Sequence, residues 1–382
     1  MTGHLAIFLP SVSGGGAERV MVILANRFAE QGFKVDLVLA QAEGAYLSQV
    51  SAMVNVVDLG VPRVLQSIPK LARYLRSSRP DAMLSALAHA NVAAIIARRL
   101  SGIKVRLVVS ERANLSVSAS NAGTLRAKFM KRFVAMAYPF ADHVITVSKG
   151  VEQDLVTGLG LSSQKVSTVY NPVVDQELLE KSQLPVEDDW FKRDQAVPVV
   201  LGVGRLSPQK DFATLLKAFS RVRAERLVRL VILGEGPLHS ELENLATELG
   251  IQGDVRLAGF KDNPFPYMRH CSVFVLSSAW EGLPGALIQA MACGAPVVST
   301  DCPDGPAEIL ENGRWGSLVP IGDVGAMAEA INSALAASDQ PDVSRRAMDF
   351  TVDQAVTNYL DILLPGHGDG HPESLNHLNS GR

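Results

Sequence analysis

Short runs of β-branched and other apolar residues alternate with helical stretches along nearly the whole chain. In the first half, this pattern predicts strands at 5–9, 35–39, 54–59, 82–86, 105–109 and 143–147, and helices at 17–31, 66–78, 89–101 and 124–138. In the second half, it predicts strands at 198–203, 229–233, 255–258, 273–276 and 296–299. Strands separated by helices of about 10–15 residues form βαβ units and parallel sheets, so we expect an α/β fold.

The length of the chain indicates that this pattern is divided between two domains. At about 100–200 residues per domain, 382 residues suggest two, and a charged, strand-poor segment lies between the halves. We predict doubly wound, Rossmann-like domains at 1–172 and 198–350, a linker at 173–197, a C-terminal helix at 351–364 that packs back on the N-terminal domain, and a disordered tail at 365–382. Two such domains facing each other place the carboxyl ends of both sheets around one central cleft, where ligands bind.

The net charge of the chain is −3, but its two halves have net charges of opposite sign. Residues 1–180 hold 19 Lys and Arg against 13 Asp and Glu, whereas residues 181–382 hold 17 against 26. The overall balance argues against nucleic acid as a partner. The basic N-terminal half is suited to an anionic surface or an anionic ligand.

The cysteines and the apolar runs restrict the cellular location. Cys271, Cys293 and Cys302 show no CxxC spacing, so we expect neither a disulfide framework nor a zinc site, and a reducing cytoplasm fits better. No apolar run approaches the ~20 residues that span a bilayer. The stretch 1–10 lacks a basic start, and we interpret it as a first strand rather than as a signal peptide.

A glycine-rich turn follows the first predicted strand. Gly14, Gly15 and Gly16 permit close approach of the backbone to a ligand, and a helix that begins near Ala17 directs its free N–H groups at the same place. The residue three positions after Gly16 is Arg19, so the dinucleotide fingerprint GxGxxG is absent, and no P-loop Lys follows. An anion site and a simple strand-to-helix turn are both open interpretations.

Two cations follow the first predicted strand of the second domain. Arg205 and Lys210 lie five residues apart, just before a helix for which Asp211 is the expected N-cap. A guanidinium fork and an ammonium point charge at the carboxyl end of a strand suit a diphosphate. The alternative is a solvated pair of charges, but the position at the cleft favours the phosphate site.

A further candidate site follows the predicted strand at 273–276. A loop there carries Glu281, Pro284 begins a helix, and Gln289 lies about two turns further along. A carboxylate in the loop can orient a sugar hydroxyl, and a Gln that faces a ligand can hydrogen-bond two adjacent hydroxyls. The alternative interpretation of Glu281 is an acidic group that complements the helix dipole.

From about residue 5 to 362, the chain resembles the retaining glycosyltransferases of family 4, which have the GT-B fold. The matching segments are GGGAERV, VYNPV at 169–173, GVGRLSPQKDF, LVILGEGPLHSELENLATELG, VRLAGF and SSAWEGLPGALIQAMACGAPVV. Each segment is weak alone, but their order and spacing together are specific. The segments VVSERANLS at 108–116 and STDCPDGPAEIL at 299–310 resemble bacterial members that extend lipid-linked or cell-surface oligosaccharides.

The resemblance implies that the two domains bind different substrates. The C-terminal domain would bind a nucleotide-sugar donor, and the N-terminal domain would be the acceptor side. Arg205 and Lys210 would hold the donor diphosphate from the C-terminal side. Gly15 and Gly16 would face the same diphosphate from the N-terminal domain.

By the same resemblance, Glu281 would bind hydroxyls of the transferred sugar, with the backbone N–H groups of Gly282 and Leu283 near the phosphates. The family usually has a second Glu, separated from the first by seven residues, which binds the nucleotide ribose. Position 289 is Gln in this chain, which can still accept a hydrogen bond from a ribose hydroxyl but predicts lower nucleotide affinity. This difference leaves open a degenerate, weakly active member of the family.

Candidates for the acceptor side follow two predicted strands of the first domain. Glu111, Arg112 and Asn114 come after the strand at 105–109, and His89 comes after the strand at 82–86. Because carboxyl ends of parallel strands meet at one edge of the sheet, we expect these side chains to line the cleft. Glu111 and Arg112 can equally form a structural ion pair, and His89 can be an ordinary surface or core histidine.

The predicted helix at 124–138 has two distinct faces. An apolar stripe is formed by Leu125, Phe129, Phe133 and Met136. Lys128, Lys131 and Arg132 share another face, which can lie on an anionic membrane surface or hold a lipid pyrophosphate. The alternative is a domain helix whose apolar face lies in the core and whose basic face is solvated.

We therefore expect a retaining hexosyl- or N-acetylhexosaminyltransferase that moves a sugar from a UDP-sugar to a hydroxyl of a polyprenyl-pyrophosphate-linked or surface-glycan acceptor. No DxD sequence occurs, so we expect catalysis without a metal and without a cofactor. Alternative functions are a nucleotide-sugar 2-epimerase of the same fold and a non-catalytic nucleotide-sugar-binding protein. The expected location is the cytoplasm, peripheral on the inner face of the cytoplasmic membrane.

Overall fold

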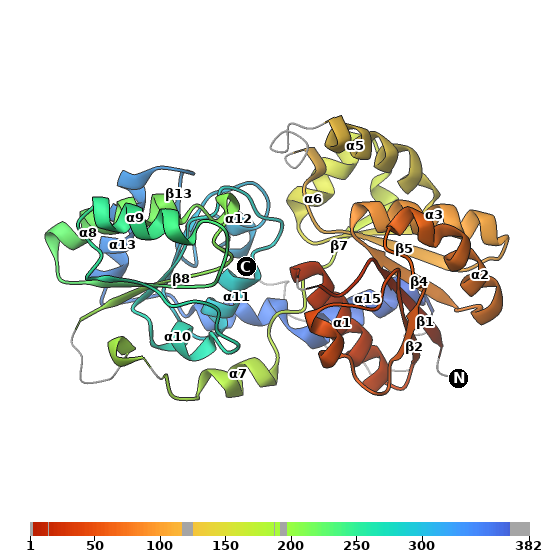
Figure 1. Ribbon diagram of the computed structural model, residues 1–382, viewed down its shortest axis with the longest axis horizontal. Helices are drawn as coiled ribbons and strands as arrows, with labels where there is room; N and C mark the ends of the chain where they lie inside the picture. Colours follow the sequence, from red (N-terminus) through yellow and green to blue (C-terminus); the bar gives the residue numbers. More distant parts are fainter. Residues whose placement is uncertain (1–2, 14, 117–124, 187, 192–196, 367–382) are drawn as a thin grey trace, which may run out of the picture.

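The computed structural model describes residues 3–13, 15–116, 125–186, 188–191 and 197–366, and for 125–128 it describes the backbone alone. Gly14, the side chain of Lys128 and the part of the predicted tail at 367–382 therefore lie outside the described residues. Figure 1 shows two lobes, each with a sheet between layers of helices. This arrangement confirms the expected α/β fold with two Rossmann-like units.

In the first lobe, seven strands of the described chain form a sheet in the order β3-β2-β1-β4-β5-β6-β7, with all neighbours parallel. The strands are β1 (His4–Leu9), β2 (Lys34–Leu39), β3 (Asn55–Asp58), β4 (Ala82–Ala86), β5 (Arg106–Glu111), β6 (His143–Thr146) and β7 (Val166–Thr168). Most of them are continuous apolar runs because a parallel sheet is covered on both faces. The sequence pattern predicts all of them except β7, which has only three residues.

Helices bury both faces of this first sheet. They are α1 (Gly16–Glu30), α2 (Ile68–Ser78), α3 (Ala88–Ser101), α5 (Leu125–Ala137), α6 (Lys149–Gln153) and α15 (Val352–Leu363). Helices α1 and α15 enclose one apolar core with strand residues such as Leu5 and Ile7. Helices α2, α3 and α5 enclose the other, around Phe8 and Val109. The C-terminal helix α15 thus packs on the first sheet although it follows the second in the chain (Figure 1).

In the second lobe, six strands of the described chain form a parallel sheet in the order β10-β9-β8-β11-β12-β13. The strands are β8 (Val199–Val203), β9 (Arg229–Leu233), β10 (Val255–Leu257), β11 (Val273–Leu276), β12 (Val297–Thr300) and β13 (Ser317–Val319). The covering helices are α7 (Gln176–Ser182), α8 (Phe212–Glu225), α9 (His239–Glu248), α10 (Phe265–His270), α11 (Gly285–Ala292), α12 (Pro306–Ile309), α13 (Val324–Ala336) and α14 (Val343–Ala347). The pattern does not predict the short strand β13.

Short 3-10 and π turns complete the described elements: η1 (Ala45–Gln49), η2 (Val64–Ser67), η3 (Tyr138–Phe140), η4 (Asp154–Gly158), η5 (Ser163–Lys165), η6 (Asp189–Phe191), η7 (Pro208–Lys210) and η8 (Met348–Phe350). The segment expected to be a linker contains α7 and η6. Its residues Leu178 and Phe191 belong to the apolar core of the second lobe. None of the helices in the described ranges is long and apolar enough to cross a bilayer.

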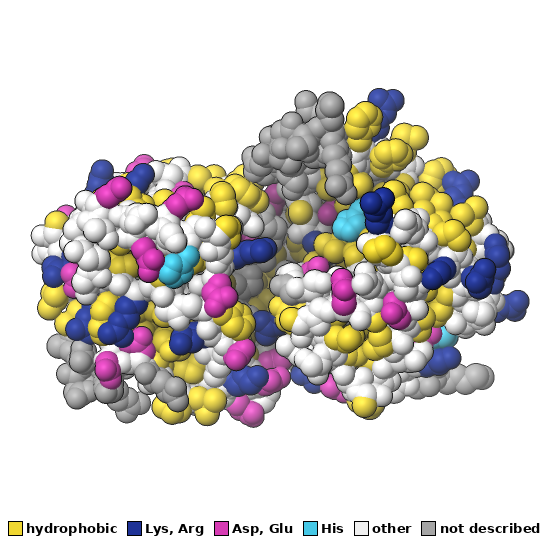
Figure 2. All heavy atoms as spheres, in the orientation of Figure 1, with side chains coloured by type: hydrophobic (Ala, Val, Ile, Leu, Met, Phe, Trp, Pro, Cys, Tyr) yellow, Lys and Arg dark blue, Asp and Glu magenta, His cyan; other side chains and the backbone are white. Residues whose placement is uncertain are grey.

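Each sheet reverses its strand order at one place, between β1 and β4 in the first lobe and between β8 and β11 in the second. A crevice opens outside the carboxyl ends of the strands at such a switch point, and ligands of this fold bind there. The turns after β1 and β4 and those after β8 and β11 are the segments in which the sequence places most of its candidate residues. The space-filling view is hollowed between the two lobes (Figure 2).

Candidate functional site

At the second switch point, Lys210 and Glu281 form an ion pair across 71 residues of sequence. Lys210 Nζ lies 2.5 Å from Glu281 Oε1, and the Ser278 hydroxyl donates to the same oxygen at 2.7 Å. The two charged side chains are only 17% and 9% exposed, so water screens this pair less than a surface pair. Glu281 Oε2 has no hydrogen-bond partner among the described residues, so this oxygen remains available to accept a hydrogen bond from a ligand hydroxyl.

Two loops are joined to hold this pair in place. Gln209 Nε2 donates to the Trp280 carbonyl at 3.0 Å, and the Ala279 N–H donates to the Gln209 carbonyl at 2.8 Å. The Ser277 hydroxyl donates to the Lys210 carbonyl at 2.7 Å. The turn after β8 and the turn after β11 therefore form one rigid unit, which fixes the positions of the lysine and the carboxylate before any ligand binds.

The remaining donor-side candidates surround this unit. Arg205 follows β8, is exposed, and has no ion-pair or hydrogen-bond partner among the described residues. Asp211 accepts from the Thr214 N–H at 3.2 Å and caps α8, as the sequence predicts. Gln289 lies half-buried on α11, and its amide makes no hydrogen bond within the described part of the chain. A cation and an amide with free hydrogen-bonding groups thus lie near the switch point.

Gly282 brings the donor-side loop into direct contact with the N-terminal lobe. A Cβ atom on Gly282 would lie 2.5 Å from the carbonyl oxygen of Arg112, which no real side chain tolerates. The neighbouring Leu283 is buried, and it belongs to an apolar cluster that includes Val147 of the N-terminal lobe. The close approach explains why glycine is needed at this position.

The glycine-rich turn lies at the N-terminus of α1. Gly15 is the N-cap and Gly16 the first helical residue, and nothing lies within 4 Å of a Cβ placed on Gly16. The Glu18 carboxylate folds back over Gly15, where a Cβ would lie 2.2 Å from Glu18 Oε2. Because that carboxylate stands at the positive end of the helix dipole, an anionic ligand at Gly15 must displace it.

Glu111 points into the N-terminal lobe and not into the cleft. It is 2% exposed, and its Oε2 accepts from the Tyr138 hydroxyl at 2.6 Å. Its Oε1 accepts from the N–H groups of Arg112 and Ala113, which shapes the turn after β5. Burial raises the pKa of Glu111 to about 7 despite these hydrogen bonds. Glu111 therefore acts on the cleft only through the turn that it holds.

Glu111→Gln is expected to remove a pH dependence of stability. The folded pKa of about 7 lies above the ordinary 4.5, so the folded state holds an extra proton between these pH values. The free energy of unfolding of the wild type therefore falls as the pH rises from about 4.5 to about 7. Urea unfolding at about pH 5 and about pH 8 should show this fall in the wild type and a smaller one in the variant. Equal falls in both proteins would show that Glu111 ionises normally.

Arg112 and Asn114 reach other parts of the structure. The Arg112 guanidinium donates to Asn171 Oδ1 at 2.5 Å and to the Tyr359 hydroxyl at 3.4 Å, so it joins the turn after β5 to α15. The Asn114 side chain hydrogen-bonds Asp304 of the C-terminal lobe. Neither Glu111 nor Arg112 needs the other as an ion-pair partner, because each has its own hydrogen-bonding groups.

His89 lies in the first turn of α3, at the carboxyl end of β4, and is exposed. The preceding Leu87 has φ 77°, a left-handed conformation that is costly for a residue with a Cβ. The strained turn therefore stands at the first switch point, beside the turn that holds Gly15. The structure brings His89 to the same edge of the sheet as Arg112.

The basic helix α5 has an orientation that the pattern alone leaves open. Among the residues 129–137, whose side chains the structure describes, Val134 is buried, with Met130 and Ala137 beside it. Three members of the apolar stripe are exposed there: Phe129 59%, Phe133 55% and Met136 63%. The side chain of Leu125, the fourth member, lies outside the described residues. Lys131 donates to the Ser116 hydroxyl at 2.9 Å, and Arg132 is exposed. The stripe is therefore not the core-facing side of the helix.

Several residues that support the site are not predicted from the sequence. Ser277, Ser278, Gln209 and Tyr138 support the charged groups described above. The first two directly follow β11, so the rule that strand ends meet at one edge could have identified them. Tyr138 gives no such signal, because it reaches Glu111 from the far end of a helix.

Within the residues that the structure describes, no three or more His, Cys, Asp or Glu side chains lie close enough together to hold a metal ion. Cys271, Cys293 and Cys302 are free and buried.

Comparison with known proteins identifies the kind of enzyme. A family model described as Glycosyltransferase Family 4 matches residues 14–177, and one described as Glycosyl transferases group 1 matches residues 197–337. The N-acetylgalactosamine-N,N'-diacetylbacillosaminyl-diphospho-undecaprenol 4-alpha-N-acetylgalactosaminyltransferase of Campylobacter jejuni is 33% identical over 344 residues, which cover 87% of this chain and 90% of the relative. The lipopolysaccharide core biosynthesis glycosyltransferase LpsE of Rhizobium meliloti is 27% identical over 330 residues, which cover 84% and 86%.

Solved structures agree in fold. Anabaena Alr3699/HepE in complex with UDP superposes with a TM-score of 0.78 at 22% identity, covering 95% of this chain and 99% of that one. A glycosyltransferase from Rickettsia africae gives a TM-score of 0.77 at 14% identity, covering 95% and 98%. The two facing sheets have the GT-B fold, and the family models and relatives show that the protein is a glycosyltransferase. The chain belongs to glycosyltransferase family 4, as its sequence resemblance indicates.

Proposed function

We propose that this enzyme transfers a sugar, with retention of configuration, from a UDP-sugar to a hydroxyl of a lipid-linked or surface-glycan acceptor. The observation that carries the proposal is the rigid Lys210–Glu281–Ser278 unit at the second switch point, with the unpaired Arg205 beside it. Two cations there can stabilise a departing diphosphate without a metal, and Lys210 is held in position before the charge develops. Glu281 Oε2 is free to accept from a hydroxyl of the transferred sugar.

In the proposed reaction, the bond between the anomeric carbon and the diphosphate oxygen breaks while the acceptor oxygen bonds to the same face of that carbon. The acceptor proton passes to the departing phosphate oxygen. Lys210 and Arg205 hold the negative charge that develops on the diphosphate. The N–H groups of Gly282 and Leu283 lie in the same loop and would donate to the phosphates.

The names of relatives support the acceptor class. The Campylobacter jejuni relative is named for transfer of N-acetylgalactosamine to a sugar on diphospho-undecaprenol, and the Rhizobium meliloti relative for lipopolysaccharide core biosynthesis. HepE, a structural neighbour, was solved with UDP. We therefore infer a UDP-N-acetylhexosamine or UDP-hexose as donor and a polyprenyl-diphosphate-linked glycan as acceptor.

A thermal-shift screen against UDP-, GDP- and ADP-sugars tests the donor assignment. Binding to the folded state alone raises the melting temperature, so UDP-sugars should stabilise the protein clearly and the others little. The stabilised donor is then incubated with a polyprenyl-diphosphate-linked sugar, and transfer is followed by mass spectrometry. A folded protein that no nucleotide sugar stabilises would contradict the proposal.

Gln289→Glu is expected to tighten UDP binding severalfold. An ionised carboxylate accepts stronger hydrogen bonds from two ribose hydroxyls than an amide oxygen does. Calorimetry measures the UDP affinity of the variant and of the wild type. Gln209→Glu is unsuitable as a control, because it breaks the hydrogen bond from Gln209 to the Trp280 carbonyl. Gln252→Glu, which changes an exposed Gln on the same lobe, controls for added charge. Unchanged UDP affinity in Gln289→Glu would count against a ribose-binding role for position 289.

We further propose that one face of the N-terminal lobe rests on an anionic membrane surface. The exposed stripe of α5 continues into Phe140, which is 48% exposed, and α3 adds Leu100 at 56%. Figure 2 shows apolar side chains gathered over α5 and α3 with basic ones among them. Apolar rings beside cations are the combination that binds a charged bilayer interface.

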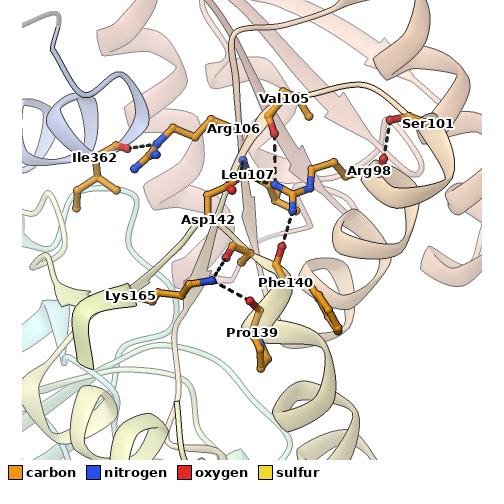
Figure 3. Close-up of polar contacts among 11 residues, drawn as sticks. Arg98, Ser101, Val105, Arg106, Leu107, Pro139, Phe140, Asp142, Lys165 and Ile362 are labelled. Atoms are coloured by element: carbon orange, nitrogen blue, oxygen red, sulfur yellow. Dashed lines mark hydrogen bonds and ion pairs between the residues drawn. The ribbon is translucent and has the colours of Figure 1, made fainter. Parts of the chain in front are cut away.

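The far end of this face is rigid and basic (Figure 3). Arg98 is bound to Asp142 and to the carbonyls of Val105 and Phe140, and Lys165 holds the Pro139 carbonyl at 2.9 Å. The same edge carries Arg99, Lys104 and Arg106 around a shallow pocket, with Arg99 stacked 4.2 Å over the Phe140 ring.

Replacing both Phe133 and Met136 with Ser is expected to weaken binding to phosphatidylglycerol vesicles by about tenfold or more, since two exposed apolar side chains lose their place in the interface. Vesicle co-sedimentation measures the change, and pure phosphatidylcholine should bind both proteins poorly. Phe260→Ser, which removes an equally exposed ring from the C-terminal lobe, should leave binding intact. Equal binding of all three proteins would exclude this face.

A further inference from the structure

The two lobes touch where the turn after β6 meets the start of α12. Val147 and Val151, from the N-terminal lobe, belong to the apolar core of the C-terminal lobe. Gly150 approaches Asp304 so closely that a Cβ on Gly150 would lie 1.9 Å from Asp304 Oδ1. The contact therefore depends on the glycine at this position, and we call the region 147–150 with 304–308 the junction.

Both carboxylate oxygens of Glu308 cross this junction. Oε2 accepts from the Lys149 N–H at 2.8 Å, and Oε1 accepts from the Tyr170 hydroxyl at 2.6 Å. Lys149 is the first residue of α6, where the helix dipole favours a carboxylate. Hydrogen bonds to an ionised, half-buried group are stronger than those between neutral groups. Glu308 therefore joins the C-terminal lobe to two segments, the start of α6 in the N-terminal lobe and the segment that carries Tyr170.

One of these segments is where the chain passes between the lobes. Within the described residues the chain crosses twice, and the two crossings lie side by side, because Val174 pairs with Thr351. Tyr170 lies at the first crossing, and its ring packs on Phe350 of the second with the ring centres 5.0 Å apart. A rotation of one lobe relative to the other must turn about these crossings. Glu308 binds the hinge itself through the Tyr170 hydroxyl.

The loop before Glu308 packs on the donor-side loop. Gly305, at φ 117°, approaches so closely that a Cβ would lie 2.7 Å from Pro284 Cδ and 2.9 Å from the Gly282 carbonyl oxygen. Gly282 in turn lies close to the Arg112 carbonyl of the opposite lobe. Because these contacts leave no free space, a displacement of Glu308 also displaces the loop at 281–284.

From these contacts, we propose that Glu308 is a positioning residue for the transfer reaction, which couples closure of the two lobes to the placement of the loop at 281–284. The inference rests on the proposed function, because that function makes the loop part of the donor site. The Glu308 carboxylate contacts protein groups and acts through them. When the lobes separate, its bond to the Lys149 N–H breaks, and the donor-side loop loses its support from the N-terminal lobe.

The test combines kinetics with a measurement of lobe separation. Glu308→Ala removes both bonds, and Tyr170→Phe removes only the bond to the hinge while keeping the ring on Phe350. Spin labels at Met53→Cys and Leu227→Cys, both exposed and on opposite lobes, report the distance distribution. The native cysteines are buried and compete little for the label. Glu329→Ala, on the exposed side of α13, is the matched control.

We expect Glu308→Ala to lower kcat/KM for the donor about 10- to 100-fold, because small misplacements of reacting groups carry costs of this size. It should also broaden the distance distribution, both without nucleotide and with UDP. Tyr170→Phe should shift both readouts in the same direction by a smaller amount. Glu329→Ala should match the wild type, and circular dichroism should show that all variants fold.

Three results would overturn the proposal: unchanged readouts in Glu308→Ala, a broader distribution with normal kinetics, or slower kinetics with an unchanged distribution. If Glu308→Ala does not fold, Tyr170→Phe alone decides between these outcomes. The distribution without nucleotide depends on no ligand, so it tests the junction even if the wild type transfers no sugar. A wild type without turnover but with a Glu308-dependent distribution would refute the proposed function and leave the mechanical coupling intact.

Discussion

Lys210→Ala is expected to lower kcat by about 10²–10³-fold. The lysine is fixed by Glu281 before a donor binds, and a preorganised cation at the place where negative charge develops typically contributes an effect of this size. Arg205→Ala should act in the same direction, because Arg205 is free to turn toward the same diphosphate. Steady-state kinetics with saturating donor measures both effects.

Lys217→Ala is the control for loss of a positive charge near the site. Lys217 is exposed on α8, the helix that follows Lys210, and should leave kcat unchanged. Melting temperatures separate a catalytic effect from unfolding, since Lys210→Ala leaves the Glu281 carboxylate without its cation. Near-normal turnover in both Lys210→Ala and Arg205→Ala would remove the basis for a diphosphate site at this switch point.

Glu281→Gln should reduce kcat/KM for the complete UDP-sugar by about 10²-fold while changing the affinity for UDP alone much less. The proposed role of this carboxylate is to accept from a hydroxyl of the transferred sugar, which UDP lacks. The amide keeps the shape and one acceptor oxygen for Lys210 and Ser278, but it loses the charge that strengthens both bonds. Turnover and UDP calorimetry on the same variant separate the two roles.

Glu241→Gln, an exposed position on α9, serves as the matched control for this charge removal. It should leave turnover and UDP affinity at the wild-type values. If Glu281→Gln weakened UDP and UDP-sugar binding equally, the carboxylate would act on the nucleotide or on Lys210 and not on the sugar.

The fold could be predicted from the sequence because its strands are continuous apolar runs between helices of regular length. The exceptions are β7 and β13, which have three residues each and therefore show no pattern. The candidate donor residues could be predicted by a simple rule, since Arg205 and Lys210 follow one strand and Glu281 another. The rule places them at one edge of a sheet, but the ion pair between residues 71 positions apart required the structure.

The orientation of helix α5 and of the Glu111 side chain could not be predicted from the sequence. The spacing of Phe129, Phe133 and Met136 indicates a stripe, but helix α5 packs through Val134 and leaves the stripe exposed. Glu111 is the last residue of β5 and lies at the expected end of the strand, yet its carboxylate accepts from the Tyr138 hydroxyl inside the lobe. In each case the deciding contact comes from a residue that the local pattern does not connect to the site. The same holds for Glu308 and Tyr170, which meet across 138 positions.

The central claim is transfer with retention from a UDP-sugar to a lipid-linked glycan. It is tested most directly by NMR of the product formed from a UDP-sugar with an α-linked sugar and a polyprenyl-diphosphate-linked acceptor. We expect a product with a new glycosidic bond of α configuration and the release of UDP. A β-linked product, a sugar nucleotide epimerised at C2 without acceptor, or donor binding without any transfer would contradict it.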